Sequence, residues 1–201
     1  MIVHAKHDGS TDRVIFMLHG TGGNENDLVN LARYIDETAT LIGIRGAVEE
    51  QGMLRYFKRY ADGSFDLKDL AKQTTALYEG MLQLLEYYKL QDAVVSVIGY
   101  SNGSNIAINL FKEFETDFTS AMLFHPSSVR PGVPFKQQSA LNVYTTGGKI
   151  DPFIAFDKFE EAVKEFEDAG IPVTTNVQPG GHQLVDAEVI EAKKFYEGII
   201  Q

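Results

Sequence analysis

The chain contains 201 residues, no cysteine, and a formal net charge of −10. This length suits a single domain, residues 1–201, with a sizeable core, and the lack of cysteine excludes disulfides, zinc–thiolate sites and a cysteine nucleophile. The acidic balance argues against nucleic acid as a partner and against stable association with a membrane. Residues 1–13 lack the apolar core of a signal peptide, so we expect a cytoplasmic protein.

Short apolar runs alternate with longer helical patterns along the chain. We expect strands at 13–20, 40–46, 92–100, 119–126, 140–148 and 172–181. We expect helices at 28–39, 66–90, 104–115, 152–170 and 186–200, with Asp66 as an N-cap. Apolar strands separated by helices predict an α/β fold, with a mainly parallel central sheet and helices on both faces.

Residues 46–66 interrupt this alternation. The segment has no clear period and contains several glycines and two aromatic–basic pairs. A long irregular loop in a compact domain is often functional. This one begins after a predicted strand, where open α/β sheets bind their ligands. We therefore expect it to border the functional site.

The sequence Gly-Tyr-Ser-Asn-Gly at 99–103 joins a predicted strand to a predicted helix. In this position the G-x-S-x-G pattern forms a tight turn that strains the serine backbone and exposes its hydroxyl above the sheet. Glycines at its two ends leave room for neighbouring backbone, and the following helix supplies free N–H donors. Ser101 is therefore the candidate nucleophile. The alternative, a turn with a purely structural role, is not excluded by the motif alone.

A serine nucleophile of this kind needs an acid and a histidine base, in the chain order Ser, Asp or Glu, His. His182 follows the last predicted strand, and Asp151 follows a strand and a Gly-Gly turn. Asp151 would accept the imidazole N–H and fix its tautomer; its alternative role is an N-cap for the next helix. His125 precedes Asp151 in the chain, so we interpret it as a hydrogen-bonded structural histidine.

An oxyanion hole requires two N–H donors. We expect the backbone of Asn102, next to the nucleophile, and that of Thr21, in the glycine-rich loop 18–28. The alternative for this loop is phosphate binding, but Glu25 stands where the G-x-G-x-x-G pattern needs its third glycine. We interpret His19 as a structural histidine that braces the loop.

With these pieces placed, the chain resembles α/β-hydrolases of the phospholipase/carboxylesterase group, which includes the acyl-protein thioesterases. The resemblance runs nearly end to end and rests on HGTGG at 19–23, GYSNG at 99–103, the GGKID-P turn that reaches Asp151, and GGH at 180–182. Within that group, GYSNG together with LFHP is most similar to the small bacterial carboxylesterases of the MhqD-like type.

The resemblance implies Ser101, Asp151 and His182 as a catalytic triad and a compact fold with little or no lid. It also implies that the segment GMLRYFKRY at 52–60, within the 46–66 loop, borders an acyl pocket. In that loop Tyr56 and Phe57 are candidate pocket walls, with core positions as their alternative. Arg55 is a candidate partner for an anionic substrate group, or else a brace for the loop. Better-studied members of the group read G-x-S-Q-G-G; here Asn102, Gly103 and Ser104 follow the serine, so selectivity near the acyl group is expected to differ.

The expected function is hydrolysis of small soluble carboxylic esters through an acyl-enzyme intermediate, with a small-molecule ester as substrate and no cofactor or metal. One alternative keeps the triad but acts on longer acyl chains, as a thioesterase or lysophospholipase. The other is a non-catalytic binding protein on a hydrolase scaffold. The sequence leaves open whether the protein is a monomer or a homodimer.

Overall fold

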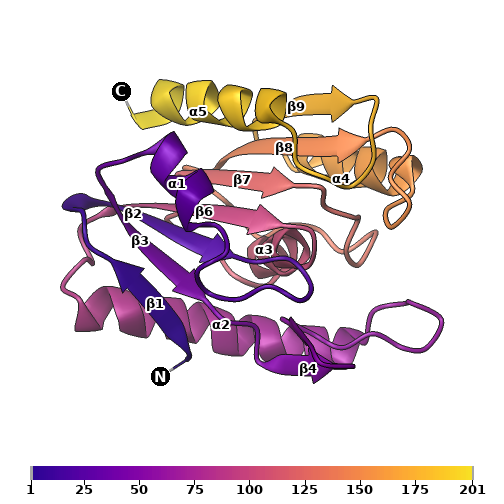
Figure 1. Cartoon of the computed structure of the whole chain (residues 1–201), viewed down its shortest axis with the longest axis horizontal. Helices are drawn as coiled ribbons and strands as arrows, with labels where there is room; N and C mark the ends of the chain where they lie inside the picture. The colour runs from indigo at the N-terminus through magenta and orange to yellow at the C-terminus, as the bar shows by residue number, and fades with distance from the viewer. Residues whose placement is uncertain (1, 201) are drawn as a thin grey trace.

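The computed structural model describes residues 2–200, which form a mainly parallel seven-stranded sheet with the order β1-β3-β2-β6-β7-β8-β9 (Figure 1). The edge strand β1 is antiparallel to β3, and every other neighbouring pair in this sheet is parallel. The strands of the sheet are β1 His4–His7, β2 Ser10–Leu18, β3 Ala39–Ile44, β6 Val94–Tyr100, β7 Ser120–Phe124, β8 Asn142–Gly148 and β9 Val173–Gln178. The predicted fold class is confirmed.

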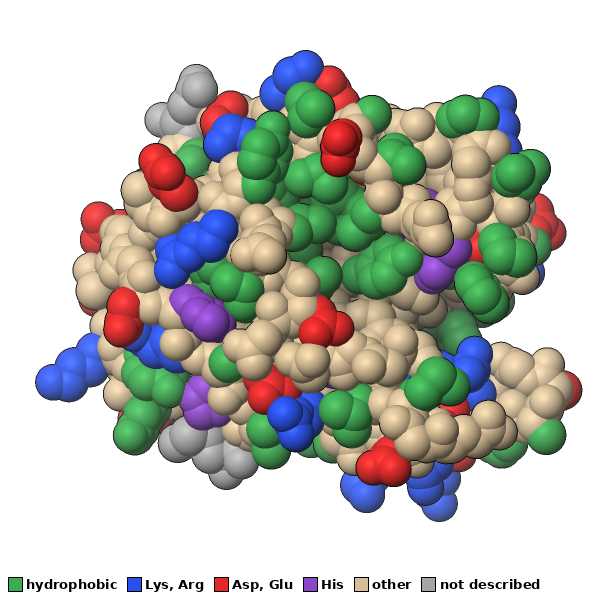
Figure 2. Space-filling model, viewed as in Figure 1, with side chains coloured by type: hydrophobic (Ala, Val, Ile, Leu, Met, Phe, Trp, Pro, Cys, Tyr) green, Lys and Arg blue, Asp and Glu red, His purple; other side chains and the backbone are tan. Residues whose placement is uncertain are grey.

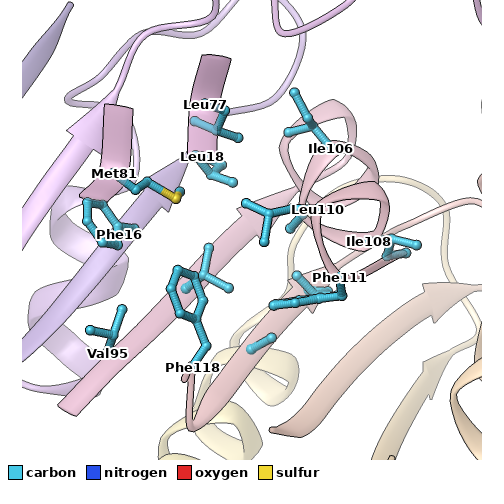
Figure 3. Packing of buried hydrophobic residues seen from close by; sticks show 14 of the residues in the cluster. Phe16, Leu18, Leu77, Met81, Val95, Ile106, Ile108, Leu110, Phe111 and Phe118 are labelled. Carbon is cyan, nitrogen blue, oxygen red and sulfur yellow. The ribbon is translucent and has the colours of Figure 1, made fainter. Parts of the chain in front are cut away.

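Five helices cover the sheet on both faces in the described part of the chain. They are α1 Val29–Ile35, α2 Leu67–Tyr87, α3 Asn102–Glu113, α4 Phe156–Asp168 and α5 Asp186–Ile200. One core cluster joins one face of the sheet to α2, α3 and α4, and a second joins the other face to α1 and α5. Figure 3 shows the first cluster, where Phe16 and Leu18 of β2 lie near side chains of α2 and α3. Because side chains alternate along a strand, both faces of β2 are buried.

The 46–66 segment contains a small hairpin of β4 Val48–Glu50 and β5 Met53–Arg55. The hairpin is tied to the loop after β2, because the N–H of Gly22 donates to the carbonyl of Leu54 at 2.8 Å. The segment therefore lies beside the C-terminal end of β2, as expected from the sequence. No helix within residues 2–200 combines the length and apolar character needed to cross a membrane.

Several element ends differ from those expected. Helix α2 begins as predicted, since the Asp66 carboxylate accepts hydrogen bonds from the N–H groups of Lys68 and Asp69. Helix α4 begins at Phe156, four residues later than Pro152, and α1 stops at Ile35 because Asp36 turns extended. These three boundaries follow capping and backbone geometry, whereas periodicity alone extends a helix as far as its apolar pattern continues.

Candidate active site

Ser101 occupies a strained turn between β6 and α3. Its backbone has φ 52° and ψ −110°, in the positive-φ region that is costly for a residue with a side chain. The turn is held on both sides: the Ser101 N–H donates to the carbonyl of Phe124 at 2.8 Å, and its carbonyl accepts from Asn105 at 3.0 Å. A side chain at Gly99 or Gly103 would collide with backbone atoms. This is the conformation expected for the serine of a G-x-S-x-G elbow.

Asp151 and His182 lie in direct contact. Nδ1 of His182 is 2.6 Å from Oδ2 of Asp151, and because a carboxylate only accepts hydrogen bonds, the proton lies on Nδ1. The other oxygen of Asp151 accepts from the N–H groups of Phe153 and Ile154 at 2.8 and 3.0 Å. Burial raises the pKa of Asp151, but the hydrogen bonds from His182 and these two N–H groups outweigh it and leave the pKa below its ordinary value.

The Asp151 carboxylate does not cap the following helix. The N-cap position of α4 is Ala155, which lies four residues beyond Asp151. The N-cap role considered from the sequence is therefore wrong. The carboxylate instead accepts hydrogen bonds from His182 and from N–H groups of its own turn.

Tyr100 connects the serine turn to the histidine loop. Its hydroxyl donates to the carbonyl of His182 at 2.7 Å, and its ring centroid lies 5.4 Å from that of the imidazole. Among the hydrogen bonds of residues 2–200, none joins the Ser101 hydroxyl to His182. Such bonds are often long without substrate and tighten when it binds.

A cavity of about 200 Å³ opens at Ser101. Both residues predicted to form the oxyanion hole, Thr21 and Asn102, line it together with the serine. The remaining lining residues are Arg55, Arg59, Gly63, Phe65, Asn105, Ser127, Phe153 and Ile154. A second cavity of about 530 Å³ shares Arg59 and Gly63 with it, so the open space continues along the 46–66 segment.

Arg55 lines the cavity and is almost fully buried, at 2% exposure. Its guanidinium donates to the Thr21 hydroxyl and to the carbonyl of Phe57, each at 3.2 Å, and lies 3.3 Å from the Glu50 carboxylate. Burial lowers the pKa of Arg55 to about 10. The group therefore stays cationic at neutral pH and also ties the hairpin to the Thr21 loop.

The two aromatic rings expected to wall the pocket are in the core instead. Tyr56 and Phe57 are 3% and 0% exposed, and neither lines the cavity. The Tyr56 hydroxyl donates to the carbonyl of Ile44 at 2.6 Å and accepts from the N–H of His19 at 3.0 Å. Burial raises the pKa of Tyr56 well above its ordinary value. Of the two positions considered from the sequence, pocket wall and core, both rings occupy the core.

Other aromatic residues border the cavity in their place. Phe65 and Phe153 line it, and the Phe153 ring centroid lies 5.3 Å from that of His182. The sequence held one usable signal for Phe153, its position two residues after Asp151. Phe65 carried none, because its approach to the site depends on the fold of the whole 46–66 segment.

The Asn102 side chain points into the protein. It is 3% exposed, and its Oδ1 accepts from the N–H of Tyr56 at 2.7 Å. The expectation that this side chain tunes selectivity directly is therefore replaced by a structural role, in which it fixes the segment beneath the cavity.

His19 also has a structural role, as predicted. Its Nδ1 lies 2.6 Å from the carbonyl of Gly20, and its Nε2 accepts from the N–H of Gly46 at 2.9 Å. These partners require a proton on Nδ1 and none on Nε2. Burial lowers the pKa of His19, which favours the same neutral form.

His125 is 1% exposed and lies close to the Asp151 carboxylate. Its Nδ1 is 3.5 Å from Oδ2 of Asp151, and its Nε2 is 2.9 Å from Oε1 of Glu188, a fully buried residue of α5. The burial agrees with the structural interpretation of His125, whereas neither ring nitrogen makes the aligned hydrogen bond that was expected. Sequence reasoning missed Glu188, because an acid in the first turn of a helix is usually solvated.

A seven-stranded, mainly parallel sheet with a strained serine after β6, and an Asp–His pair after β8 and β9, defines an α/β-hydrolase. Residues 56–188 match the dienelactone hydrolase family. The chain belongs to that family.

Similar proteins span essentially the whole chain. A protein of Bacillus subtilis (strain 168) named "Putative hydrolase MhqD" is 38% identical over 98% of both chains. The crystal structure of the Bacillus cereus carboxylesterase superposes with a TM-score of 0.94 at 37% identity, covering 99% of this chain and 95% of that one. A structure of YahD with malic acid gives a TM-score of 0.89 at 30% identity, covering 99% and 100%. The protein is thus a hydrolase of the dienelactone hydrolase/carboxylesterase type.

Proposed function

We propose that this hydrolase cleaves carboxylic esters of small soluble substrates, with Ser101, Asp151 and His182 as its catalytic triad. The observation that carries the proposal is the 2.6 Å contact between His182 and Asp151, joined to the turn of Ser101 by the hydrogen bond from Tyr100 to the His182 carbonyl. An unactivated serine hydroxyl is a poor nucleophile, so an oriented imidazole beside it is the feature that catalysis requires.

The reaction proceeds in two acyl transfers. His182 takes the proton of Ser101 as its oxygen attacks the ester carbonyl, and the resulting oxyanion accepts hydrogen bonds from the N–H groups of Thr21 and Asn102. His182 then protonates the leaving alcohol, and the acyl group remains on Ser101. Water, deprotonated by His182, attacks this acyl-enzyme and releases the acid.

The dimensions of the cavity support short acyl groups. Drug-sized ligands occupy pockets of roughly 300–1,000 Å³, whereas the space at Ser101 is about 200 Å³. A long acyl chain would have to extend along the adjoining cavity beside Arg59. This favours a short-chain esterase over a thioesterase or lysophospholipase acting on long chains.

Two arginines that line the cavity favour a substrate ester that carries a negative charge. Arg55 and Arg59 both line it, and Arg55 is held in place by Glu50 and Thr21. YahD, one of the similar proteins, has been solved with malic acid, a molecule with two carboxyl groups. We therefore propose that Arg55 and Arg59 contact an anionic group of the substrate.

The test is hydrolysis of p-nitrophenyl esters of increasing acyl length by the wild type and by Ser101→Ala. We expect the highest kcat/KM for short chains. We expect Ser101→Ala to retain the fold and lose at least about 1,000-fold in kcat, since the hydroxyl is the nucleophile. A Ser101→Ala variant with full activity would exclude Ser101. An optimum beyond about ten carbons would favour the long-chain alternative, because such a chain exceeds the cavity.

A further inference from the structure

His125 and Glu188 form a buried pair that the proposed reaction does not use. The His125 imidazole lies between two carboxylates, with Nε2 2.9 Å from Glu188 and Nδ1 3.5 Å from Asp151. Both side chains of the pair have no exposed surface. Neither ring nitrogen makes an aligned hydrogen bond, so both contacts are close approaches of the imidazole to a carboxylate.

The pair is contiguous with the proposed triad. One nitrogen of each imidazole and one oxygen of Asp151 lie within 4.8 Å of one another, and the ring centroids of His125 and His182 are 5.3 Å apart. Both histidines approach the same atom, Oδ2 of Asp151. The position of that oxygen therefore depends on both.

Two carboxylates lie close to the His125 ring. An unprotonated ring nitrogen would place its lone pair beside a carboxylate oxygen, 2.9 Å away at Nε2 or 3.5 Å away at Nδ1, so protons on both nitrogens would replace repulsion with attraction. Two buried carboxylates without a counter-charge would also be strongly unfavourable. The other titratable groups that face His125 are His182 and Tyr100, whose ring centroid is 6.1 Å away. Neither supplies the positive charge that the two carboxylates need.

Glu188 is itself held in the ionised form that this arrangement requires. Its Oε2 accepts from the N–H of Val185 at 2.8 Å. Burial raises the pKa of Glu188, but the contact with His125 and the Val185 N–H lower it below its ordinary value.

The backbone of His125 is strained to reach this position. Its φ is +49°, which is uncommon for a non-glycine residue and is disfavoured further by the proline that follows it. The segment is fixed on both sides, since the His125 N–H donates to the carbonyl of Thr146 at 3.0 Å and the Ser127 N–H donates to Asn105 at 2.8 Å. Strain of this kind persists where the surrounding structure imposes it, often at a functional site.

We propose that His125 and Glu188 are positioning residues for catalysis, forming a second imidazolium–carboxylate pair that holds Asp151 and offsets its charge. The inference rests on the proposed function, because it assigns the pair an effect through Asp151 on His182. His125 keeps Oδ2 aimed at His182, and Glu188 keeps His125 protonated and in place.

The first test measures protonation directly and does not depend on activity. Nitrogen-15 NMR of histidine-labelled protein at pH 7 should show a histidine with both ring nitrogens protonated, assigned to His125 by its absence from the spectrum of His125→Asn. Glu188→Gln preserves shape but removes the charge, and in that variant one nitrogen of His125 should be unprotonated. A wild-type His125 with one unprotonated nitrogen would overturn the proposal.

The second test is the pH dependence of kcat/KM. In His125→Asn the local charge becomes more negative by one, which favours the protonated form of the base. The acid limb, meaning the rise of kcat/KM on the low-pH side of the profile, should therefore move to higher pH by roughly half a unit or more. This is the size of effect expected when one of two charges about 5 Å apart in a partly polar site is removed. We also expect kcat to fall by about tenfold, less than the roughly 10⁴-fold loss seen when a triad Asp is itself neutralised, with little change in KM.

Adding Glu188→Gln to His125→Asn should reverse the shift in pH dependence. The double variant His125→Asn/Glu188→Gln loses one positive and one negative charge, so its acid limb should return towards the wild-type position. A purely structural role would instead leave the limb unmoved in all variants. Asparagine suits the positive φ at position 125, and Glu188→Gln alone keeps the NMR test available if His125→Asn does not fold.

His7→Asn is the matched control, because His7 lies in the edge strand β1 and should change neither kcat nor the acid limb. The proposed function and this inference fail differently. A wild type without esterase activity contradicts the function. An active wild type whose kcat and acid limb are unchanged by His125→Asn contradicts the positioning role alone.

Discussion

Two residues at the ends of neighbouring strands, Ser101 after β6 and His125 after β7, have positive φ values of 52° and 49°. A hydrogen bond links the two turns, since Ser101 N–H donates to the carbonyl of Phe124. Backbone strain is thus present both where the proposed nucleophile and where the proposed positioning histidine emerge from the sheet. The strain can persist because β6 and β7 pair with each other and with neighbouring parallel strands on both sides.

Asn102 offers a prediction at the residue scale. Its buried Oδ1 accepts the N–H of Tyr56 at 2.7 Å. Asn102→Ala leaves that N–H without a partner, so the free energy of unfolding should fall by about 1–3 kcal/mol. Denaturant unfolding measures the loss. A variant as stable as the wild type would show that Tyr56 finds another acceptor and that the side chain does not fix the segment.

The candidate site was partly predictable from the residues themselves. The chain order of Ser101, Asp151 and His182, each after a strand, predicts where their side chains converge, and the Asp–His contact agrees. Glu188 was not predictable, because its partner is 63 positions away in sequence and only the packing of α5 against the sheet brings them together. Tyr56 carried no periodic pattern, so its core position also required the folded structure.

At the scale of elements, the approach of α3 to β2 decides where the serine turn sits. Gly103 lies in the first turn of α3, and a methyl group there would overlap the Leu18 carbonyl and lie 2.7 Å from the carbonyl of His19. Both obstacles are backbone atoms of the strand end that precedes the Thr21 loop. A larger residue must therefore push α3, and Asn102 with it, away from the end of β2.

Gly103→Ala should destabilise the protein by at least about 2 kcal/mol, as overpacking against backbone does, and should also lower kcat. Gly198→Ala in α5 is the matched control, since a methyl group there meets nothing within 4 Å. That change should raise the free energy of unfolding by up to about 1 kcal/mol through helix propensity. Thermal unfolding of both variants, together with ester hydrolysis, provides the comparison. A Gly103→Ala variant as stable as Gly198→Ala would contradict the packing argument.

The elements themselves were predictable to different degrees. Long apolar runs such as β6 and the amphipathic α2 have strong periodicity, and both were expected within a few residues of their ends. The edge strand β1 and the hairpin of β4 and β5 were not expected. Their strands have only four or three residues and no apolar run, and they depend on pairing with neighbours for their conformation.

At the scale of the whole molecule, the chain carries a formal net charge of −10. On the face drawn in Figure 2, acidic and basic side chains are interspersed among polar and hydrophobic surface. At the proposed site, Arg55 and Arg59 share one carboxylate, that of Glu50, at 3.3 and 3.8 Å, so the three groups together carry one net positive charge. A small anionic ester would be attracted locally even though the long-range field is unfavourable.

Asp36 ties distant parts of the chain together. Its carboxylate lies 2.7 Å from Arg13 of β2 and accepts from the hydroxyl of Tyr196 in α5 at 3.1 Å. Burial raises the pKa of Asp36, but hydrogen bonds from Arg13, Thr38 and Tyr196 lower it overall, to about 2. A carboxyl group whose pKa is lower in the folded state stabilises the fold above its unfolded pKa.

Asp36→Asn should therefore lower the free energy of unfolding by about 2 kcal/mol at pH 7. The difference from the wild type should shrink once the pH falls below the ordinary carboxyl pKa of 3.8 and be lost as the pH falls through the folded pKa of about 2. Asp12→Asn, at an exposed position of β2 next to Arg13, is the control and should change stability by at most about 0.5 kcal/mol. A deficit in Asp36→Asn that persists undiminished to pH 2 would show that ionisation is not its cause.

The central claim, that Ser101 carries the acyl group during turnover, is tested most directly by mass spectrometry of the wild type after reaction with a fluorophosphonate. We predict one adduct per chain, located by peptide mapping on Ser101, and loss of ester hydrolysis in proportion to labelling. Activity that persists in fully labelled protein, or an adduct on any other residue, would contradict the claim.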